Sequence, residues 1–315
     1  QNEYKDIANK HFNHSADYLK DGINALNTAF VQQGALFIAV KRGKIVSHPV
    51  YIYNITDGAV LALPRTLMHL AENSQVQIVE TFVNVANAES FTNQIMEIVV
   101  EKAAILDYCK IQNEGPQANQ VSTTHIRQTG KSLINAVTIS LNGGIVRNNT
   151  NVVMEAPYCE AHLYGLYYPK GNTLIDNHTV VDNVEPNCYS NELYKGMLDE
   201  NGTGVFNGKI FVRQPAQKTN AFQSNKNVLL SDTASVNTKP QLEIFADDVK
   251  CSHGCTVGKL NEDGLFYLQS RGVPEKTAKA MLLHGFAGDI IEKIKIEAIR
   301  EYVDQLVSER LGYEA

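Results

Sequence analysis

The stretch that decides the fold runs from Val76 to Ile111 and reads VQIVETFVNVANAESFTNQIMEIVVEKAAILDYCKI. It holds short runs rich in β-branched and aromatic residues, and a new run begins about every ten to a dozen residues. No helix-length amphipathic segment separates the runs, which excludes an ordinary βαβ sheet. The same pattern of short β-rich runs continues from Ala35 to Gly258, and a sandwich, a barrel or a solenoid can account for it.

Asn and Gly residues punctuate the β-rich runs. The pairs and triplets that stand out are Asn142-Gly143-Gly144, Asn148-Asn149, Gly171-Asn172, Asn201-Gly202 and Asn207-Gly208. Asn and Gly adopt left-handed backbone conformations at little cost, and every coil of a β-solenoid needs such corners. In residues 94 to 100 apolar side chains occur at both odd and even positions, whereas in residues 249 to 257 the two kinds of position differ in character. These features favour a solenoid over a sandwich, although no repeat can be aligned by eye.

Helical sequence is expected at both ends of the chain. At the N-terminus we predict a helical segment over residues 1–34, with one helix over 15–30 whose cap is Ser15. Its apolar residues at helical spacing are Tyr18, Leu19, Ile23, Leu26 and Phe30. Because the first residue is Gln1 rather than Met, we expect this segment to be truncated. The β-rich core is predicted over 35–259 and a C-terminal helical domain over 260–315.

Within the C-terminal domain, Asn261 can cap a short helix that Gly272 ends, and Pro274 suits the start of the next helix. Two apolar stripes follow at helical spacing. One comprises Ala287, Ile290, Ile291, Ile294 and Ala298, and the other Ile296, Ile299, Val303, Leu306 and Val307. Either the helix breaks near Lys295 and each half packs on its own protein, or one stripe is a docking face for a partner.

Composition excludes several classes of function. The hydrophobic fraction of 43% can build a large core, and no run of Lys or Arg accompanies the net charge of −6, so we expect no nucleic-acid partner. No stretch approaches the roughly 20 apolar residues that span a bilayer, and no signal peptide is evident, so we expect no membrane association. The five sparse cysteines predict reduced thiols and a cytoplasmic protein.

The segment that could carry chemistry is Val249 to Val257, VKCSHGCTV. If it is a strand, its period of two places Cys251, His253 and Cys255 on one face. Two thiolates and an imidazole suit iron, a nascent iron-sulfur cluster or zinc, and such ligands on one strand need others from elsewhere. The alternative is that this face is simply core, since cysteines are often buried and valines share it.

Other polar groups carry weaker signals. Cys159 and His162 could form a small site, but residues three apart on a strand face opposite ways. Asp176, Asn177, His178 and Asp182 could hide a catalytic carboxylate, although turn and cross-strand roles for Asn and Asp are commoner. The chain has no nucleophile elbow, phosphate-binding loop or dinucleotide fingerprint, so any energy input has to come from a partner.

Long segments resemble the SufB/SufD family of the sulfur-mobilisation (Suf) pathway, and within it the SufD branch. They are DNHTVVDNVEPNCYSNELYKGML (176–198), GKIFVRQPAQKTNAFQSNKNVLLSDTASVNTKPQLEIFADDVKCSHGCTVGKL (208–260) and LFYLQSRGVP (265–274). Looser similarity extends upstream through 160–169 and 28–43. The SufD assignment within the family depends on CSHG at 251–254, where SufB differs.

The resemblance implies a right-handed parallel β-helix followed by a C-terminal helical domain. It also implies a non-enzymatic scaffold that pairs with a SufB-like paralogue and docks a SufC-like ATPase on its C-terminal helices. In that SufBCD complex, Cys251 and His253 would contact a transient iron-sulfur cluster or iron, and nothing would be tightly bound to the isolated chain. Cys255 is a further candidate metal ligand, although the family commonly has a small residue there.

Three alternatives stay open at this point. The chain could be a SufB-type scaffold, a polysaccharide-active β-helix enzyme, or an interaction module in which the motif has become purely structural. A β-helix enzyme would use carboxylates along a groove and would be expected to be secreted. When the paralogue is absent, we expect a homodimer instead of the heterodimer.

Overall fold

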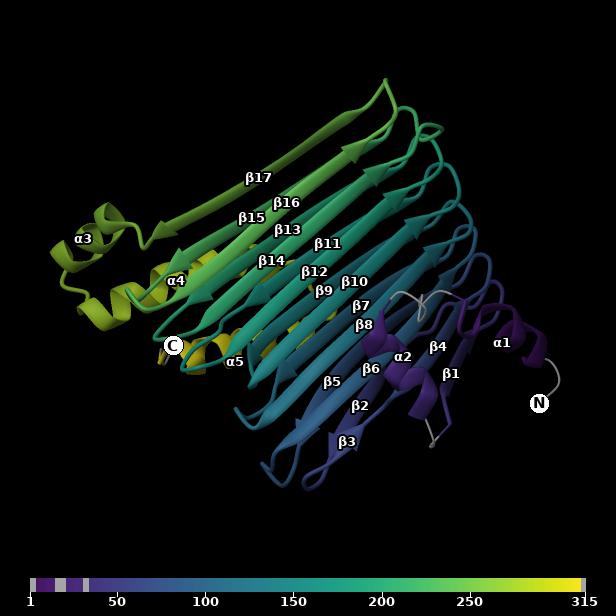
Figure 1. The fold of residues 1–315 in the computed structure, drawn as a ribbon. Coiled ribbons are helices and arrows are strands. Elements are labelled where there is room, and N and C mark those ends of the chain that lie inside the picture. Colours follow the sequence, from purple (N-terminus) through teal and green to yellow (C-terminus); the bar gives the residue numbers. More distant parts are fainter. Residues whose placement is uncertain (1–3, 15–20, 31–33, 313–315) are drawn as a thin grey trace.

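The computed structural model describes residues 4–14, 21–30 and 34–312, and these form a parallel β-helix with helices at both ends (Figure 1). Successive strands mostly alternate between two parallel sheets, one ordered β1-β4-β6-β8-β10-β12-β14-β16 and the other β17-β15-β13-β11-β9-β7-β5-β2. Short β3 pairs with β6 beside this path. The predicted solenoid is therefore confirmed, because a sandwich would pair its strands antiparallel.

The strands, in chain order, are β1 Leu36–Val40, β2 Val50–Thr56, β3 Leu61–Ala62, β4 Arg65–Leu70, β5 Gln75–Asn84, β6 Ser90–Val100, β7 Ile105–Asn113, β8 Ala118–Gln128, β9 Leu133–Asn142, β10 Ile145–Met154, β11 Glu160–Tyr167, β12 Leu174–Asn183, β13 Tyr189–Leu198, β14 Thr203–Val212, β15 Asn220–Leu229, β16 Ser235–Ile244 and β17 Lys250–Lys259.

Left-handed residues turn the chain at recurring corners of the coil. Tyr158, Asn187 and Lys218 hold φ between 60° and 63° at equivalent corners of successive coils. Gly143 and Gly171 also have positive φ, as the sequence predicted for their turns. Two predicted turns were wrong, because Asn148-Asn149 lies inside β10 and Asn207-Gly208 inside β14.

Asn148 illustrates why an Asn can stand inside a strand of this fold. Its side chain points into the coil, where its Nδ2 donates to Asn177 Oδ1 of the next coil at 3.2 Å. The same Nδ2 donates to Gln112 Oε1 at 3.0 Å. Stacked coils place equivalent side chains one above another, so buried amides satisfy each other along the axis. One part of the interior is thus a polar ladder beside an apolar column.

The C-terminal module comprises α3 Glu262–Ser270, α4 Glu275–Ile291 and α5 Glu297–Leu311. Asn261 caps α3 as predicted, its side chain accepting a hydrogen bond from Gly264 N at 2.8 Å. The chain leaves helix geometry between α4 and α5, so of the two alternatives the break near Lys295 is the one observed.

Most of the two apolar stripes is buried against the outer face of the sheet that contains β9, β11 and β13. Ile290 and Val303 are fully buried there, whereas Ala298 is exposed and does not belong to its predicted stripe. The interpretation that each half of the helical pair packs on its own protein is therefore correct. These stripes are not a free docking face.

At the N-terminus, α1 Lys5–His11 and α2 Gly22–Phe30 cover part of the other sheet. The predicted helix began at Ser15, but residues 15–20 lie outside the described part, so its first turns, with Tyr18 and Leu19, are untested. The apolar positions that remain were misassigned, because Phe30 is 56% exposed and Asn27 is 0% exposed. Asn27 is buried because its Nδ2 donates to Asn93 O of β6 at 2.7 Å.

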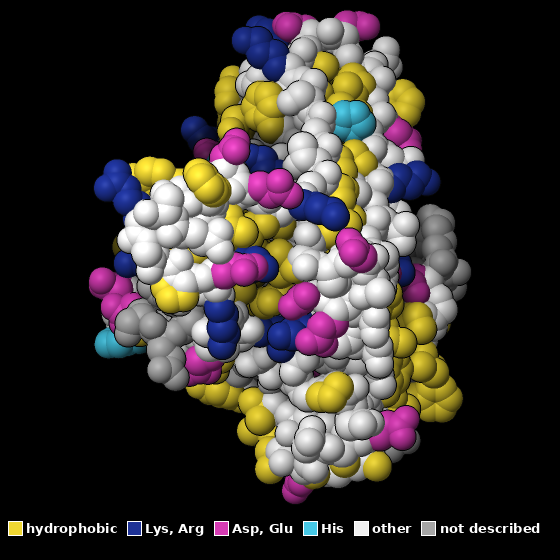
Figure 2. All heavy atoms as spheres, turned by 90° about the vertical axis from the view of Figure 1, so that its left-hand side faces the viewer, with side chains coloured by type: hydrophobic (Ala, Val, Ile, Leu, Met, Phe, Trp, Pro, Cys, Tyr) yellow, Lys and Arg dark blue, Asp and Glu magenta, His cyan; other side chains and the backbone are white. Residues whose placement is uncertain are grey.

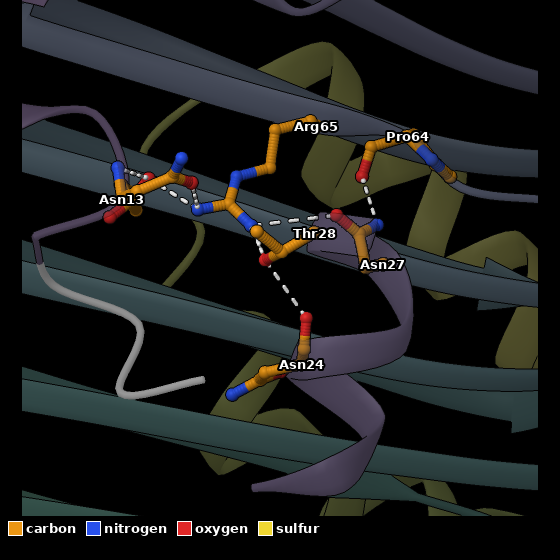
Figure 3. A network of polar contacts seen from close by, with 7 residues as sticks. Asn13, Asn24, Asn27, Thr28, Pro64 and Arg65 are labelled. Carbon is orange, nitrogen blue, oxygen red and sulfur yellow. Dashed lines mark hydrogen bonds and ion pairs between the residues drawn. The ribbon is translucent and has the colours of Figure 1, made fainter. Parts of the chain in front are cut away.

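A buried arginine fastens this N-terminal segment to the sheet (Figure 3). Arg65 of β4 donates to Glu97 at 2.8 Å, to Asn13 at 2.6 Å and to Thr28 at 3.1 Å. Because α2 covers β6, that strand is buried on both faces, which explains why residues 94 to 100 are apolar on both parities.

Candidate functional site

The last coil of the β-helix leaves both of its strands with a free edge. β17 is hydrogen-bonded to β15 on one side only, and β16 to β14 on one side only. Pro240 lies within β16, which is compatible with an edge strand because proline has no N–H to give to a further neighbour. Two rows of backbone donors and acceptors are therefore available at this end of the molecule.

The predicted ligand residues share one face of β17, as their spacing indicated. Cys251 and Cys255 pair in register with Ala221 and Asn225 of β15, and His253 pairs with Gln223. The three β15 partners are buried inside the coil. Cys251, His253 and Cys255 therefore face the interior side at the open end of the helix, one layer beyond the last fully enclosed residues.

The three side chains differ in their surroundings. Cys251 is half-buried against the apolar core, and this burial raises the pKa of its thiol. His253 is exposed, so the competing interpretation that this face is simply core fails at His253 and applies only in part to Cys251. Cys255 is exposed too, and its Sγ lies 2.7 Å from Thr238 Oγ1 of β16, a contact that joins the two edge strands.

These residues do not form a complete metal site by themselves. In the described ranges no three His, Cys, Asp or Glu side chains are grouped so that they could hold a metal ion. The reason is geometric, since alternate residues on a strand are about 6.6 Å apart and so cannot all reach one ion. An ion or cluster at this face would need further ligands from outside the described residues.

Polar side chains fill the coils directly beneath this face, and sequence reasoning missed them. Gln223, beneath His253, donates to the buried carboxyl of Glu192, and burial raises the pKa of Glu192 to about 7. Asn225, beneath Cys255, donates to the Tyr167 hydroxyl at 3.1 Å. The available signal was FQSNKNV (222–228), in which Gln223, Asn225 and Asn227 recur at every second position. Alternate residues of a strand lie on one face, so these three amides share a face and indicate that it is polar.

The weaker candidates turn out to have structural roles. Cys159 is buried in the core, whereas His162 points outward and pairs with Glu160 at 2.7 Å, so the two residues face opposite ways as their spacing predicted. Asp176 pairs with Arg147 and His178, each at 2.8–2.9 Å.

The other acidic residue of that group, Asp182, binds Arg213 of the next coil through two bonds of 2.8 Å. Asn177 of the same group accepts the hydrogen bond from Asn148. These are the cross-strand roles that the sequence favoured over catalysis.

The helical module presents a second surface. α3 buries none of its residues, and Phe266 and Tyr267 are 74% and 58% exposed. Next to α3 lies a hollow of about 500 Å³ with an apolar floor that includes Leu230 and Leu283. Figure 2 shows this end of the molecule, with basic and acidic side chains around apolar ones. In the described ranges, no helix is long and apolar enough to cross a membrane.

Comparison with known proteins agrees with this architecture. The SufBD core domain of the SUF iron-sulfur cluster assembly system matches residues 53–286, and the SufBD N-terminal region matches residues 1–52. The chain is 32% identical to the iron-sulfur cluster assembly protein SufD of Escherichia coli, over 90% of this chain and 68% of that protein.

Further relatives extend the family across bacteria. An iron-sulfur cluster assembly SufBD family protein of Synechocystis is 30% identical over 90% of this chain and 65% of its own length. SufD of Bacillus subtilis is 26% identical over 97% of this chain and 70% of its own length. The chain thus spans about two thirds of the length of these relatives. It belongs to the SufBD family of iron-sulfur cluster assembly proteins.

Proposed function

We propose that this chain is a non-enzymatic scaffold subunit on which an iron-sulfur cluster is assembled at the interface with a SufB-like paralogue. The observation that carries the proposal is the terminal coil, where the half-buried Cys251 and the exposed His253 and Cys255, the candidate cluster ligands, lie on a strand with a free edge. The relatives are named as assembly proteins, which supports the same role.

Pairing of sheet edges is the interaction that this end of the molecule favours. An unpaired strand edge binds a further strand through main-chain hydrogen bonds. Ile244, Phe245 and Val257 are between 42% and 56% exposed at the same end and would be covered by a partner. A second copy of this chain offers the same edges, so we expect a homodimer when the paralogue is absent.

An incomplete ligand set also indicates assembly with a partner. Cys251, His253 and Cys255 are spread along one strand, so only one or two of them can reach a given iron atom. The remaining ligands would come from the paralogue, and the cluster would be a transient cargo of the complex. His253 is the principal candidate ligand, because its ring is exposed and imidazole is a suitable ligand for iron.

The C-terminal helices, residues 260–315, are the proposed docking site for a SufC-like ATPase. Since most of both apolar stripes is used internally, the docking surface is instead α3, with Phe266 and Tyr267 as its aromatic anchors. The free thiols of all five cysteines suit a reducing compartment, and we propose that the complex works in the cytoplasm.

The experiment that tests cluster assembly compares His253→Ala with wild type in a complex co-expressed with the SufB-like and SufC-like proteins. Anaerobic cluster formation is followed by absorption and Mössbauer spectra, and size-exclusion chromatography checks that the complex is intact. Ser252→Ala is the matched control, because Ser252 is the exposed neighbour on the opposite face of the strand.

We expect the intact His253→Ala complex to lose cluster while Ser252→Ala keeps the wild-type yield. Unchanged cluster in His253→Ala would mean that the motif is structural and that the chain only supports its partner. For the ATPase, Phe266→Ala should reduce co-purification of the SufC-like protein, while Gln269→Ala, exposed on the same helix, should not.

A further inference from the structure

Two cysteines occupy equivalent positions in successive coils. Cys159 immediately precedes β11, and Cys188 immediately precedes β13. The next residues, Glu160 and Tyr189, are paired in register, and Tyr189 N donates to Cys159 O at 2.9 Å. Neighbouring parallel strands lie about 4.8 Å apart, which falls within the Cα separations of roughly 4.4–6.8 Å found across disulfides.

Both thiols are free and enclosed. Each cysteine is 1% exposed and belongs to the apolar core of the coil. Each sulfur lies 3.4 Å from a backbone carbonyl oxygen, that of Gly130 for Cys159 and that of Ala156 for Cys188. The neighbouring Cys188 thiol lowers the pKa of Cys159, and Cys159 together with burial raises the pKa of Cys188. Of the two thiols, Cys159 is therefore the one that loses its proton more readily.

We propose that Cys159 and Cys188 are a redox modification site, in which hydrogen peroxide oxidises the pair to a disulfide that links two consecutive coils. The Cys159 thiolate attacks the peroxide, forming an S–O bond as the O–O bond breaks, and the leaving hydroxide takes a proton to become water. The Cys188 sulfur then attacks the Cys159 sulfenic acid, so that the S–S bond forms and a second water leaves. One peroxide is reduced and two thiols are oxidised.

The corner of the coil provides the path for a small oxidant. Tyr158 and Asn187 directly precede the two cysteines, and both hold the left-handed conformation that turns the chain. Tyr158 is 57% exposed, so the corner is at the surface although the sulfurs are not. Local opening of one corner would expose the thiols without separating the strands. The disulfide would then resist separation of the β11 and β13 coils, since cross-links restrict the unfolded chain.

The test treats the full-length reduced protein with hydrogen peroxide, then denatures it, labels thiols with N-ethylmaleimide and digests it with trypsin. Lys170 separates the two cysteines into different peptides. We expect two fewer labelled thiols than in the reduced protein, a cross-linked peptide joining Cys159 to Cys188, and its loss on treatment with dithiothreitol. The oxidised protein should also melt at a higher temperature than the reduced one.

Matched variants make the assignment specific. Cys159→Ser and Cys188→Ser should each abolish the cross-link, and a serine hydroxyl can keep the bond to the same carbonyl. Cys109→Ser should retain it, because Cys109 is buried between Val79 and Val137 of the neighbouring coils. Full labelling of all thiols after peroxide, or oxidation confined to Cys251 and Cys255, would overturn the proposal.

Discussion

The ion pair that ties α4 to the β-helix allows a sharp test of how this module is held. Lys195 of β13 is only 4% exposed, and its Nζ donates to Phe286 O at 2.9 Å and to Asp289 at 2.5 Å. Asp289 is 59% exposed. The free-energy cost of removing each partner is therefore different. Removal of Asp289 leaves a buried ammonium with one carbonyl acceptor, whereas removal of Lys195 leaves a carboxylate that water can solvate.

We expect Asp289→Ala to destabilise docking of α4 by about 2 kcal/mol, the scale of a charged hydrogen bond lost at a buried group. Lys195→Met should cost much less, because methionine fills a similar volume and removes the buried charge together with its need for a partner. The double variant should lose no more docking free energy than Lys195→Met alone, because the ion pair is already absent in that variant.

Hydrogen exchange of the α4 amides measures this docking directly. A loss of about 2 kcal/mol corresponds to about 30-fold faster exchange if α4 opens locally. Amides of β6, on the other sheet, serve as the internal reference. Exchange of the α4 amides that is as fast in Lys195→Met as in Asp289→Ala would contradict this difference between the two partners.

Two further predictions concern the interior of the coils. Because burial raises the pKa of Glu192 from 4.5 to about 7, its stabilising contribution is complete below about pH 4.5 and is lost as the pH rises through about 7. Urea unfolding between pH 4.5 and 8 should show this decline, and Glu192→Gln should make it shallower, with the remainder due to Glu114, whose pKa burial also raises to about 7. An unchanged pH slope in that variant would contradict the assignment. Gly165→Ala should cost about 1–3 kcal/mol in urea unfolding, since the new Cβ would lie 2.2 Å from the buried ring of Tyr194. Gly254→Ala, where no atom lies within 4 Å, should be neutral, and equal losses in the two variants would refute the packing argument.

Local sequence was sufficient for the features that depend on local geometry. The restarting β-rich runs excluded a βαβ sheet because no helix separated them, and their Asn and Gly turns favoured a solenoid over a sandwich. The parallel β-helix itself was implied by the family resemblance. Asn261 and Pro274 marked helix starts that the structure confirms. The alternation of VKCSHGCTV placed Cys251, His253 and Cys255 on one face for the same reason, since a strand has a period of two.

Burial and partners could not be predicted in this way, because they depend on what packs against each face. Ile23 and Phe30 were assigned to the buried stripe of α2, but Asn24 and Asn27 are the buried residues. The amide of Asn27 can be buried because it donates a hydrogen bond to a backbone carbonyl of the sheet. Likewise, Asn148-Asn149 looked like a turn until stacking showed a partner amide one coil away.

By itself the sequence determined a β-rich body with helices at both ends and the strand that carries the candidate ligands, since these follow from periodicity and turn chemistry. The choice of a β-helix depended on the family resemblance as well. Only the tertiary structure decided that His253 is exposed at an open end, that most of the apolar stripes are consumed internally, and that Cys159 meets Cys188. Coil stacking is the physical reason, because it brings together residues about thirty positions apart whose separation no local pattern encodes.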